Sequence, residues 1–198
     1  MRRRFKLKAF IILVAVFALG ILLPLILHAS TDDNARSVKV AYTQKEFVDN
    51  LAPTAQKMSK TYGVPASILL SQAAYESNYG SSLLSVKYHN LYSLSDSLSA
   101  QPGQEHILLK DNVYSKGKWQ YQKVDFAVFK DWSSSMLAYL EGLRQGRWGE
   151  STYKEVAGTT SYKVAAEKLQ AAGFNSDPDY AKHLISIVET YHLSKYDH

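Results

Sequence analysis

Cysteine is absent from the 198 residues of the chain. This absence excludes a disulfide-stabilised scaffold, a metal site with cysteine ligands and a cysteine nucleophile. Glycine and proline are also scarce, at 10 and 5 residues, which excludes a collagen-like or low-complexity chain. Hydrophobic residues make up 46% of the sequence, as in packed globular proteins. The sequence therefore predicts one globular domain of ordinary size together with a short additional segment.

The excess of positive over negative charge comes from one end of the chain. Residues 1–8 contain five basic side chains and no acidic one, and these five account for the formal net charge of +5. The rest of the chain carries equal numbers of basic and acidic residues and is therefore neutral. Nucleic-acid-binding proteins usually present a strongly basic face. We therefore expect no nucleic-acid partner.

A long apolar stretch follows the basic end. Residues 9–27 carry no charge, and a helix of that length spans about 28 Å, close to the ~30 Å hydrocarbon core of a bilayer. We expect a cytoplasmic flank at 1–8, a transmembrane signal-anchor at 9–29 and an extracellular tether at 30–43. The alternative is a cleaved signal peptide, although Leu27 is large where the cleavage motif needs a small residue.

The remaining residues, 44–198, have the pattern of a mainly helical α+β domain. Apolar residues recur at helical spacing in five stretches, which are 44–62, 65–77, 162–172 and the segments beginning at Asp131 and Asp177. Two stretches, 107–114 and 118–129, have the character of strands joined by a turn at Lys116-Gly117. Residues 78–104 look like a loop with short turns. The expected architecture is a helical lobe with a small β-hairpin lobe.

Glu76 is the first candidate for chemistry. It ends an apolar helix and precedes a loop rich in serine, asparagine and glycine. The negative end of the helix dipole and apolar neighbours both disfavour a charged carboxylate, and so raise its pKa. A carboxyl that stays protonated near neutral pH is suited to general acid catalysis. The alternative is an ordinary surface glutamate at a helix end.

Tyrosine is abundant, with 14 residues, and several lie in polar stretches of the chain. Sugar rings bind against aromatic faces, so a tyrosine-lined groove suits a glycan ligand, although any single tyrosine could equally cover the edge of a core. The six histidines show no metal-ligand spacing, and no phosphate-binding loop or GxSxG motif occurs. We therefore expect no metal and no organic cofactor.

Four ordered motifs carry a family resemblance. They are Tyr62–Ser67, Ala73–Ser81, Asn90–Tyr92 and Asp177–Ala181. Together they resemble the bacterial endo-β-N-acetylglucosaminidases of glycoside hydrolase family 73, which are peptidoglycan hydrolases with a lysozyme-like fold. The resemblance implies that Glu76 is the catalytic acid and that Tyr180 lies in the active site. The expected substrate-binding residues are Tyr79, Asn90, Leu91, Tyr92, Tyr114 and Asp177.

One feature departs from the family pattern. Many members carry a second glutamate on the β lobe, and in this register Val113 takes its place. Asp111 lies two residues away on the same face of the strand and is our candidate second carboxylate. Glu105 and Asp96 are further candidates. If none of them acts, the 2-acetamido oxygen of N-acetylglucosamine can serve as the nucleophile, with Tyr180 positioning that group.

The sequence thus predicts a membrane-anchored peptidoglycan hydrolase that cuts the β-1,4 bond after N-acetylglucosamine. Its partners would be glycan strands and the cell membrane, contacted through residues 9–29, and a membrane protein partner stays open. One alternative is a lytic transglycosylase or muramidase that cuts after N-acetylmuramic acid. Another alternative is a non-enzymatic glycan-binding subunit of a cell-wall complex.

Overall fold

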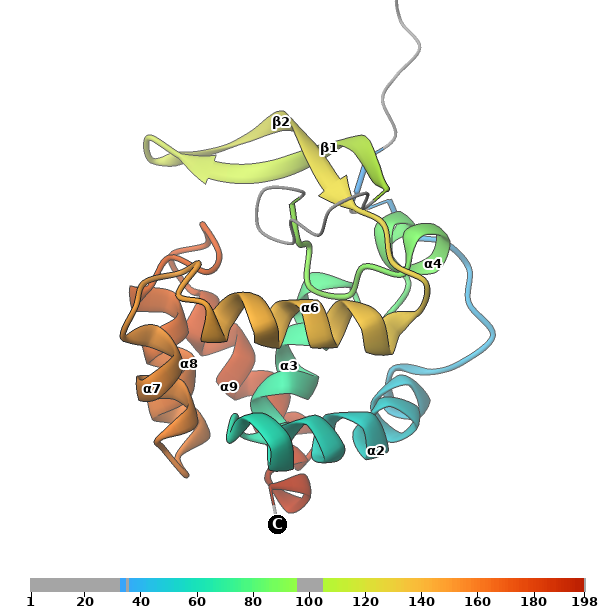
Figure 1. Cartoon of the computed structure of the whole chain (residues 1–198). Coiled ribbons are helices and arrows are strands. Elements are labelled where there is room, and N and C mark those ends of the chain that lie inside the picture. The colour runs from blue at the N-terminus through green and yellow to red at the C-terminus, as the bar shows by residue number, and fades with distance from the viewer. Residues whose placement is uncertain (1–32, 35, 96–104, 198) are drawn as a thin grey trace, which may run out of the picture. The chain divides into compact units, whose positions relative to one another are not determined.

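Most of the described chain is helical (Figure 1). The structure is a computed structural model that describes residues 33–34, 36–95 and 105–197. The predicted membrane segment at 9–29 and the candidate Asp96 lie outside these residues. Within the described residues, no helix combines the length and the apolar character that crossing a membrane requires.

Helices surround a central apolar helix, and a β-hairpin lies at one side of them (Figure 1). In chain order the helices are α2 (Gln44–Tyr62), α3 (Ala66–Glu76), α4 (Leu83–Tyr88), α6 (Trp132–Arg144), α7 (Thr152–Ala157), α8 (Tyr162–Ala171), α9 (Tyr180–Thr190) and the 3-10 helix η1 (Leu193–Tyr196). Strands β1 (His106–Ser115) and β2 (Lys118–Ala127) pair antiparallel, with Ser115 opposite Lys118 at the turn. The expected helical lobe with a small β-hairpin lobe is confirmed.

Capping residues define the ends of the longer helices. Thr43 and Glu46 form a capping box, in which each side chain accepts a hydrogen bond from the backbone N–H of the other. Helix α2 ends at Gly63, which has a φ of 73°. Asp131 accepts a hydrogen bond from the backbone N–H of Ser134 and so begins α6. These boundaries were all predicted from the sequence.

Two short helices were not predicted. Helices α4 and α7 have six residues each, which is too short for an apolar period to show in the sequence. Helix α4 lies within residues 78–104, where we expected a loop with turns. Ser82 caps it by accepting a hydrogen bond from the N–H of Ser85, and this cap was the available signal.

The core is built around α3. Every residue of this helix from Ala66 to Ala74 is buried. Helices α2, α8 and α9 contact α3 from different sides, and its alanine and serine side chains are small enough to admit them closely. A helix enclosed in this way has little freedom to shift. The position of its last residue, Glu76, is therefore set by the core.

The start of the described chain differs from a free tether. Asp33 forms a parallel bridge with Lys110 on β1, and Ser37 forms an antiparallel bridge with Ser82 before α4. The backbone N–H of Asn34 donates to the carbonyl of Lys110 at 2.7 Å. The described part of the expected tether at 30–43 is thus joined both to the hairpin and to the helical lobe.

The turn after α3 generates a prediction about stability. Gly80 has a φ of 73°, and a Cβ atom there would lie 2.7 Å from the Phe47 ring and from the Tyr42 hydroxyl. Gly80→Ala should therefore lower the free energy of unfolding by about 2–4 kcal/mol, from backbone strain and overpacking together. Chemical denaturation monitored by circular dichroism measures this loss.

Gly117 provides the matched control. It has a similar φ of 77°, but no atom lies within 4 Å of a Cβ added there. Gly117→Ala should therefore show the backbone strain alone, about 1 kcal/mol. Equal losses for the two variants would contradict the packing argument.

Candidate active site

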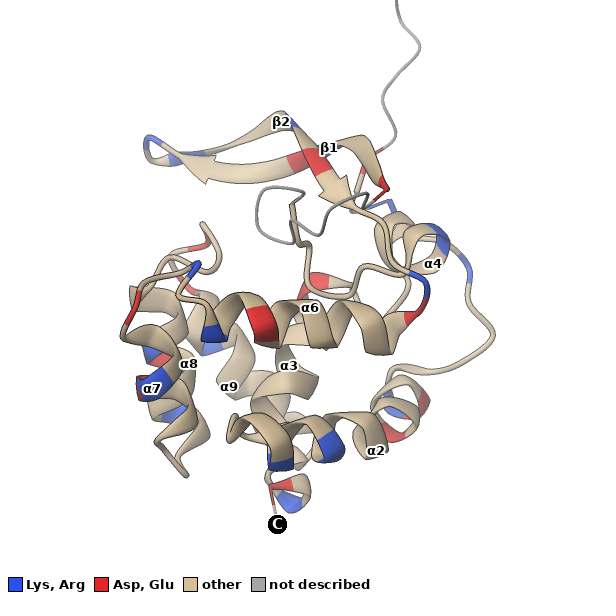
Figure 2. Cartoon of the chain, in the orientation of Figure 1, with Lys and Arg blue, Asp and Glu red and all other residues tan. Residues whose placement is uncertain are grey.

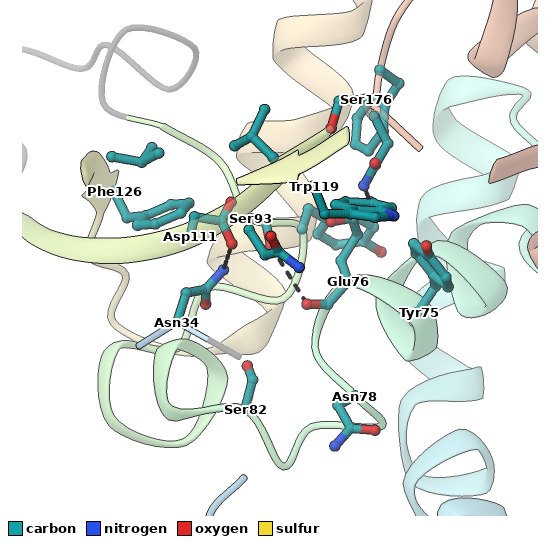
Figure 3. Close-up of a pocket in the computed structure, with 16 residues that line it drawn as sticks. Asn34, Tyr75, Glu76, Asn78, Ser82, Ser93, Asp111, Trp119, Phe126 and Ser176 are labelled. Carbon is teal, nitrogen blue, oxygen red and sulfur yellow. Dashed lines mark hydrogen bonds between the residues drawn. The ribbon is translucent and has the colours of Figure 1, made fainter. Parts of the chain in front are cut away.

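A cavity of about 410 Å³ is lined by residues of both lobes. Figure 3 shows Glu76 and Asp111 among the side chains that line it. The lining residues come from the N-terminal segment, from the end of α3 and its following turn, from Tyr92-Ser93, from both strands and from residues 174–176. Segments far apart in the sequence therefore meet at one site.

Glu76 is the last residue of α3, and the chain turns sharply after it. Asn78 and Tyr79 have φ values of 48° and 54°, so with Gly80 three consecutive residues are left-handed. The Glu76 side chain is half-buried and accepts a hydrogen bond from Asn175 Nδ2 at 2.8 Å. The Ser93 hydroxyl donates to the Glu76 backbone carbonyl at 3.4 Å (Figure 3).

Burial raises the pKa of Glu76 to about 7. Hydrogen bonding to Asn175 opposes this shift, and the nearby charge of Asp111 adds to it. Interactions with the Tyr180 and Ser93 hydroxyls favour the charged form. A carboxyl with a pKa near 7 is protonated in a large fraction of molecules at neutral pH and can donate that proton. The direction of this shift agrees with the one expected from the sequence, and desolvation is its main cause.

Behind Glu76 lies a buried chain of hydrogen bonds. The Tyr139 hydroxyl donates to Gln72 Oε1 at 2.8 Å, and Gln72 Nε2 donates to the Tyr180 hydroxyl oxygen at 3.1 Å. All three side chains are fully buried. The Tyr180 oxygen accepts from Gln72, which leaves its own proton free to be donated, and an interaction with Tyr180 favours the charged form of Glu76. Tyr180 thus contacts the site from the core side of the cavity.

Asp111 is the second carboxyl group in the cavity. Its Oδ1 accepts a hydrogen bond from Asn34 Nδ2 at 3.1 Å (Figure 3). Burial raises the pKa of Asp111, while the hydrogen bonds from Asn34 and from the Asn112 backbone hold it down. Val113 lines the same cavity, as expected for residues two apart on one strand. Glu105 is exposed and is not among the residues that line the cavity.

The Asn90-Leu91-Tyr92 motif lies in the core beside the cavity. Asn90 is 1% exposed, and its Nδ2 donates to the carbonyls of Leu94 and Ala127 at 2.9 Å each. These bonds join the end of β2 to the loop that follows α4. Leu91 is fully buried. Tyr92 lines the cavity, but its hydroxyl is turned to the backbone of α3. Asn90 and Leu91 therefore support the groove from behind.

Two predicted binding tyrosines lie outside the cavity lining. The Tyr79 ring packs against Phe47 and Tyr191, with ring centroids 6.4 and 5.5 Å apart. The Tyr79 side chain is part of this aromatic cluster and does not line the cavity. Tyr114 lies 5.4 Å from the Trp119 ring, and Trp119 is the residue of this pair that lines the cavity.

Asp177 reaches the site through another residue. Its carboxylate is buried and accepts a hydrogen bond from the Tyr75 hydroxyl. It also accepts from the backbone N–H of Asp179 at 2.9 Å. Tyr75 lines the cavity, so Asp177 fixes a lining residue and is not itself part of the lining.

Several lining residues were missed by the sequence reasoning. They are Asn34, Tyr75, Asn78, Ser93, Trp119 and Asn175. Asn175 lies 99 positions from Glu76, and Asn34 lies 77 positions from Asp111. Nothing in the local sequence pattern links residues so far apart. Trp119 could have been found, because it is a large aromatic residue beside the predicted turn and is 47% exposed.

Charges on the domain are mixed. Figure 2 shows basic and acidic residues distributed over the helices and the hairpin. Within the described residues, no group of three or more histidine, aspartate or glutamate side chains is placed to hold a metal ion. The cavity itself is lined by two carboxyl groups, amides, hydroxyls and aromatic rings.

Residues 52–193 match the profile of the Glucosaminidase family, which is described as mannosyl-glycoprotein endo-beta-N-acetylglucosaminidase. The chain belongs to this family. The predicted resemblance and the predicted class, glycoside hydrolase, are thereby confirmed. The family match includes both Glu76 and Asp111.

Individual proteins with similar sequences extend this comparison. The exo-glucosaminidase LytG of Bacillus subtilis (strain 168) is 30% identical over 201 residues, covering 98% of this chain and 70% of LytG. A probable N-acetylmuramidase of Lactococcus lactis is 26% identical and covers 76% of this chain, which spans only 34% of that relative. Other relatives are named peptidoglycan hydrolases. The expectation of a peptidoglycan hydrolase is confirmed at the level of the family.

Solved structures show the same fold. The catalytic domain of the autolysin Auto from Listeria monocytogenes superimposes with a TM-score of 0.66 at 27% sequence identity. The superposition covers 81% of this chain and 91% of that domain. The fold described above is thus similar to that of a known autolysin catalytic domain.

The Asn175 contact generates a prediction about pH. Asn175→Ala removes a hydrogen bond that favours the charged form of Glu76, so the pKa of Glu76 should rise above about 7. A general acid works while protonated, below its pKa, and loses activity as the pH rises through it. The basic limb of the pH–rate profile should therefore move to higher pH, by roughly 0.5–1 unit.

The measurement is kcat/KM for cleavage of purified peptidoglycan between pH 5 and pH 9. Asn50→Ala is the matched control, because Asn50 is an exposed asparagine on α2. Its profile should match that of the unaltered chain. A basic limb that stays in place or moves to lower pH in Asn175→Ala would show that this contact does not tune Glu76.

Proposed function

We propose that the chain cleaves peptidoglycan glycan strands at the β-1,4 bond after N-acetylglucosamine, with Glu76 as the general acid. The observation that carries this proposal is a carboxyl group with a pKa of about 7 in the wall of a cavity between two lobes. Trp119 offers an aromatic face to a sugar ring in the same cavity. The name of the B. subtilis relative supports cleavage on the N-acetylglucosamine side.

In the proposed reaction the Glu76 proton moves to the oxygen that links the two sugars. The bond from that oxygen to the anomeric carbon of N-acetylglucosamine breaks, and positive charge develops at that carbon. The Glu76 carboxylate left behind is stabilised by Asn175 and by the Tyr180 hydroxyl. Because Tyr180 is fully buried and outside the cavity lining, we assign it to positioning Glu76 and not to contact with the sugar.

Asp111 is the proposed second carboxylate. It lines the cavity with Glu76, and its charge acts on the Glu76 pKa. In its ionised form it can activate a water that attacks the anomeric carbon, which inverts the configuration. Alternatively it can stabilise an oxazolinium intermediate formed by the substrate's own acetamido group, which retains the configuration. The anomer first released, read by NMR, distinguishes these two routes.

The muramidase alternative rests on a specific observation, which is that several relatives are named probable N-acetylmuramidases. A single general acid also suits a lytic transglycosylase, and this alternative differs in its products. Cleavage after N-acetylglucosamine leaves that sugar at the reducing end. A muramidase leaves N-acetylmuramic acid there, and a transglycosylase leaves its anhydro form.

The central prediction concerns Glu76. Glu76→Gln should lower glycan cleavage by about 10²–10⁴-fold, because it removes the proton donor and keeps the shape of the side chain. Peptidoglycan binding by the variant should persist. Glu150→Gln, at an exposed glutamate of the same chain, is the matched control and should keep full activity.

Mass spectrometry of the digest gives the products of the unaltered chain. We expect reducing-end N-acetylglucosamine, and reducing-end N-acetylmuramic acid or its anhydro form would establish one of the alternatives. Internal cleavage yields long fragments first, whereas cleavage from strand ends yields disaccharides from the start. Retention of more than about a tenth of the activity in Glu76→Gln would overturn the assignment of the acid.

We propose further that residues 9–29 anchor the chain in the cell membrane with the domain outside. The support is the uncharged run at 9–27 behind a basic flank. In fractionated cells the full-length chain should sediment with the membrane, and external protease should degrade the domain in intact protoplasts. Recovery of a soluble form that begins near Ser30 would show instead that the segment is a cleaved signal peptide.

A further inference from the structure

Asn34 lies in the segment before the first long helix, yet it forms part of the cavity wall. It is 4% exposed, and its side-chain Nδ2 donates to Asp111 Oδ1 at 3.1 Å. Figure 3 shows its amide directed at the Asp111 carboxylate. A buried contact between side chains 77 positions apart requires that the backbone of both be held in place.

The backbone of this segment is fixed on two sides. The Asn34 N–H donates to the Lys110 carbonyl at 2.7 Å, which places Asn34 beside the residue that precedes Asp111. On the other side, the N–H of Leu83 donates to the carbonyl of Arg36 at 2.8 Å, and the N–H of Val38 donates to the carbonyl of Ser81 at 2.7 Å. The segment thus joins β1 to the turn that follows Glu76.

One polar atom of the Asn34 side chain is left in an unfavourable environment. Its Oδ1 is buried without a hydrogen-bond partner among the described residues. An unpaired buried acceptor is unfavourable, and native structures contain few of them. The amide is retained here although only its donor end is satisfied, and that donor end is directed at a carboxylate in the active site. The arrangement therefore favours the Asp111 contact over full pairing of the amide.

We propose that Asn34 is a positioning residue that orients the Asp111 carboxylate for the reaction, so that the segment preceding the domain is part of the catalytic machinery. The proposal rests on the proposed function, because it requires Asp111 to act in its ionised form. It adds a residue that lies outside the family match at 52–193. Asn34 acts through Asp111 and is not assigned a contact with the sugar.

The charged surroundings of Asp111 set the sign of the expected pH effect. The titratable groups near Asp111 are Asp33 in the N-terminal segment beside β1, and Glu76, Tyr75 and Tyr92 in the cavity lining. The register partner of Asp111 on β2 is the neutral Gln122, while Lys110 and Lys123 pair one position along, where side chains point to the opposite face of the hairpin. Asn34 is thus a main source of stabilisation for the Asp111 charge, together with the Asn112 backbone.

Asp111 in its proposed role works while ionised, above its pKa, and its activity is lost as the pH falls through that pKa. Asn34→Leu removes the donor and keeps the approximate volume, so the Asp111 pKa should rise. The acidic limb of the kcat profile should then move up by about one pH unit. Below that limb kcat should fall about tenfold, with little change above it and little change in KM.

A double-mutant cycle separates positioning from structural support. The full chain is purified in detergent and assayed on peptidoglycan as Asn34→Leu, Asp111→Asn and the double variant. Positioning through Asp111 predicts that Asn34→Leu has no further effect once Asp111 is asparagine. Asn34→Asp, which keeps the shape and places a second carboxylate beside Asp111, should move the acidic limb further upward than Asn34→Leu. Asn50→Leu, at the exposed asparagine of α2, should leave the profile unchanged.

Each outcome has a distinct meaning. A loss for Asn34→Leu that is equal at every pH and equal in both backgrounds would overturn the proposal and leave Asn34 a structural role only. An unmoved acidic limb in both Asn34 variants would overturn it as well. Full activity of Asp111→Asn would remove the role of Asp111, and with it the positioning role, while leaving Glu76 as the acid. Full activity of Glu76→Gln would instead contradict the proposed function itself.

Discussion

Glu76 holds an ionisable carboxyl at the point where a fully enclosed helix leaves the core. Burial disfavours the charged form of Glu76, and the hydrogen bond from Asn175 partly offsets this effect. Burial outweighs the hydrogen bond, so the pKa of Glu76 lies at about 7, above the usual glutamate value. Moving α3 by a small distance would change both effects together. The close packing of α2, α8 and α9 around α3 therefore maintains the environment that sets the pKa of Glu76.

The polar residues inside the core belong to the same balance. Tyr139, Gln72 and Tyr180 form a buried chain of hydrogen bonds. A buried amide such as that of Gln72 destabilises the fold unless its hydrogen-bond partners are held in place. Here it orients the Tyr180 hydroxyl toward Glu76, so that a core feature supports the site. On this side of the cavity, residues that pack the core also position groups of the site.

Local chemistry explains what the sequence could predict. Thr43, Gly63 and Asp131 mark helix ends through caps, and the strand-like stretches on both sides of Lys116-Gly117 predict the hairpin. Glu76 could be singled out because its helix is apolar and its loop is polar. The partners of the two carboxylates could not be found, since Asn175 and Asn34 reach them across 99 and 77 positions. Only the packed structure brings these residues together.

Hydrogen bonds from several segments join the hairpin to the helical lobe beside the cavity. Asn90 links Ala127 at the end of β2 to the loop after α4, and the Asp33–Val38 segment links β1 to the turn after Glu76. A two-stranded sheet has little stability of its own, so the position of Asp111 relative to Glu76 depends on these links. The separation of the two carboxylates, which governs the stereochemical course of glycoside hydrolysis, therefore depends in part on residues that precede the family match at 52–193. A chain cut just before α2 would lose the link made by Asn34, Arg36 and Val38 and would keep the helical core.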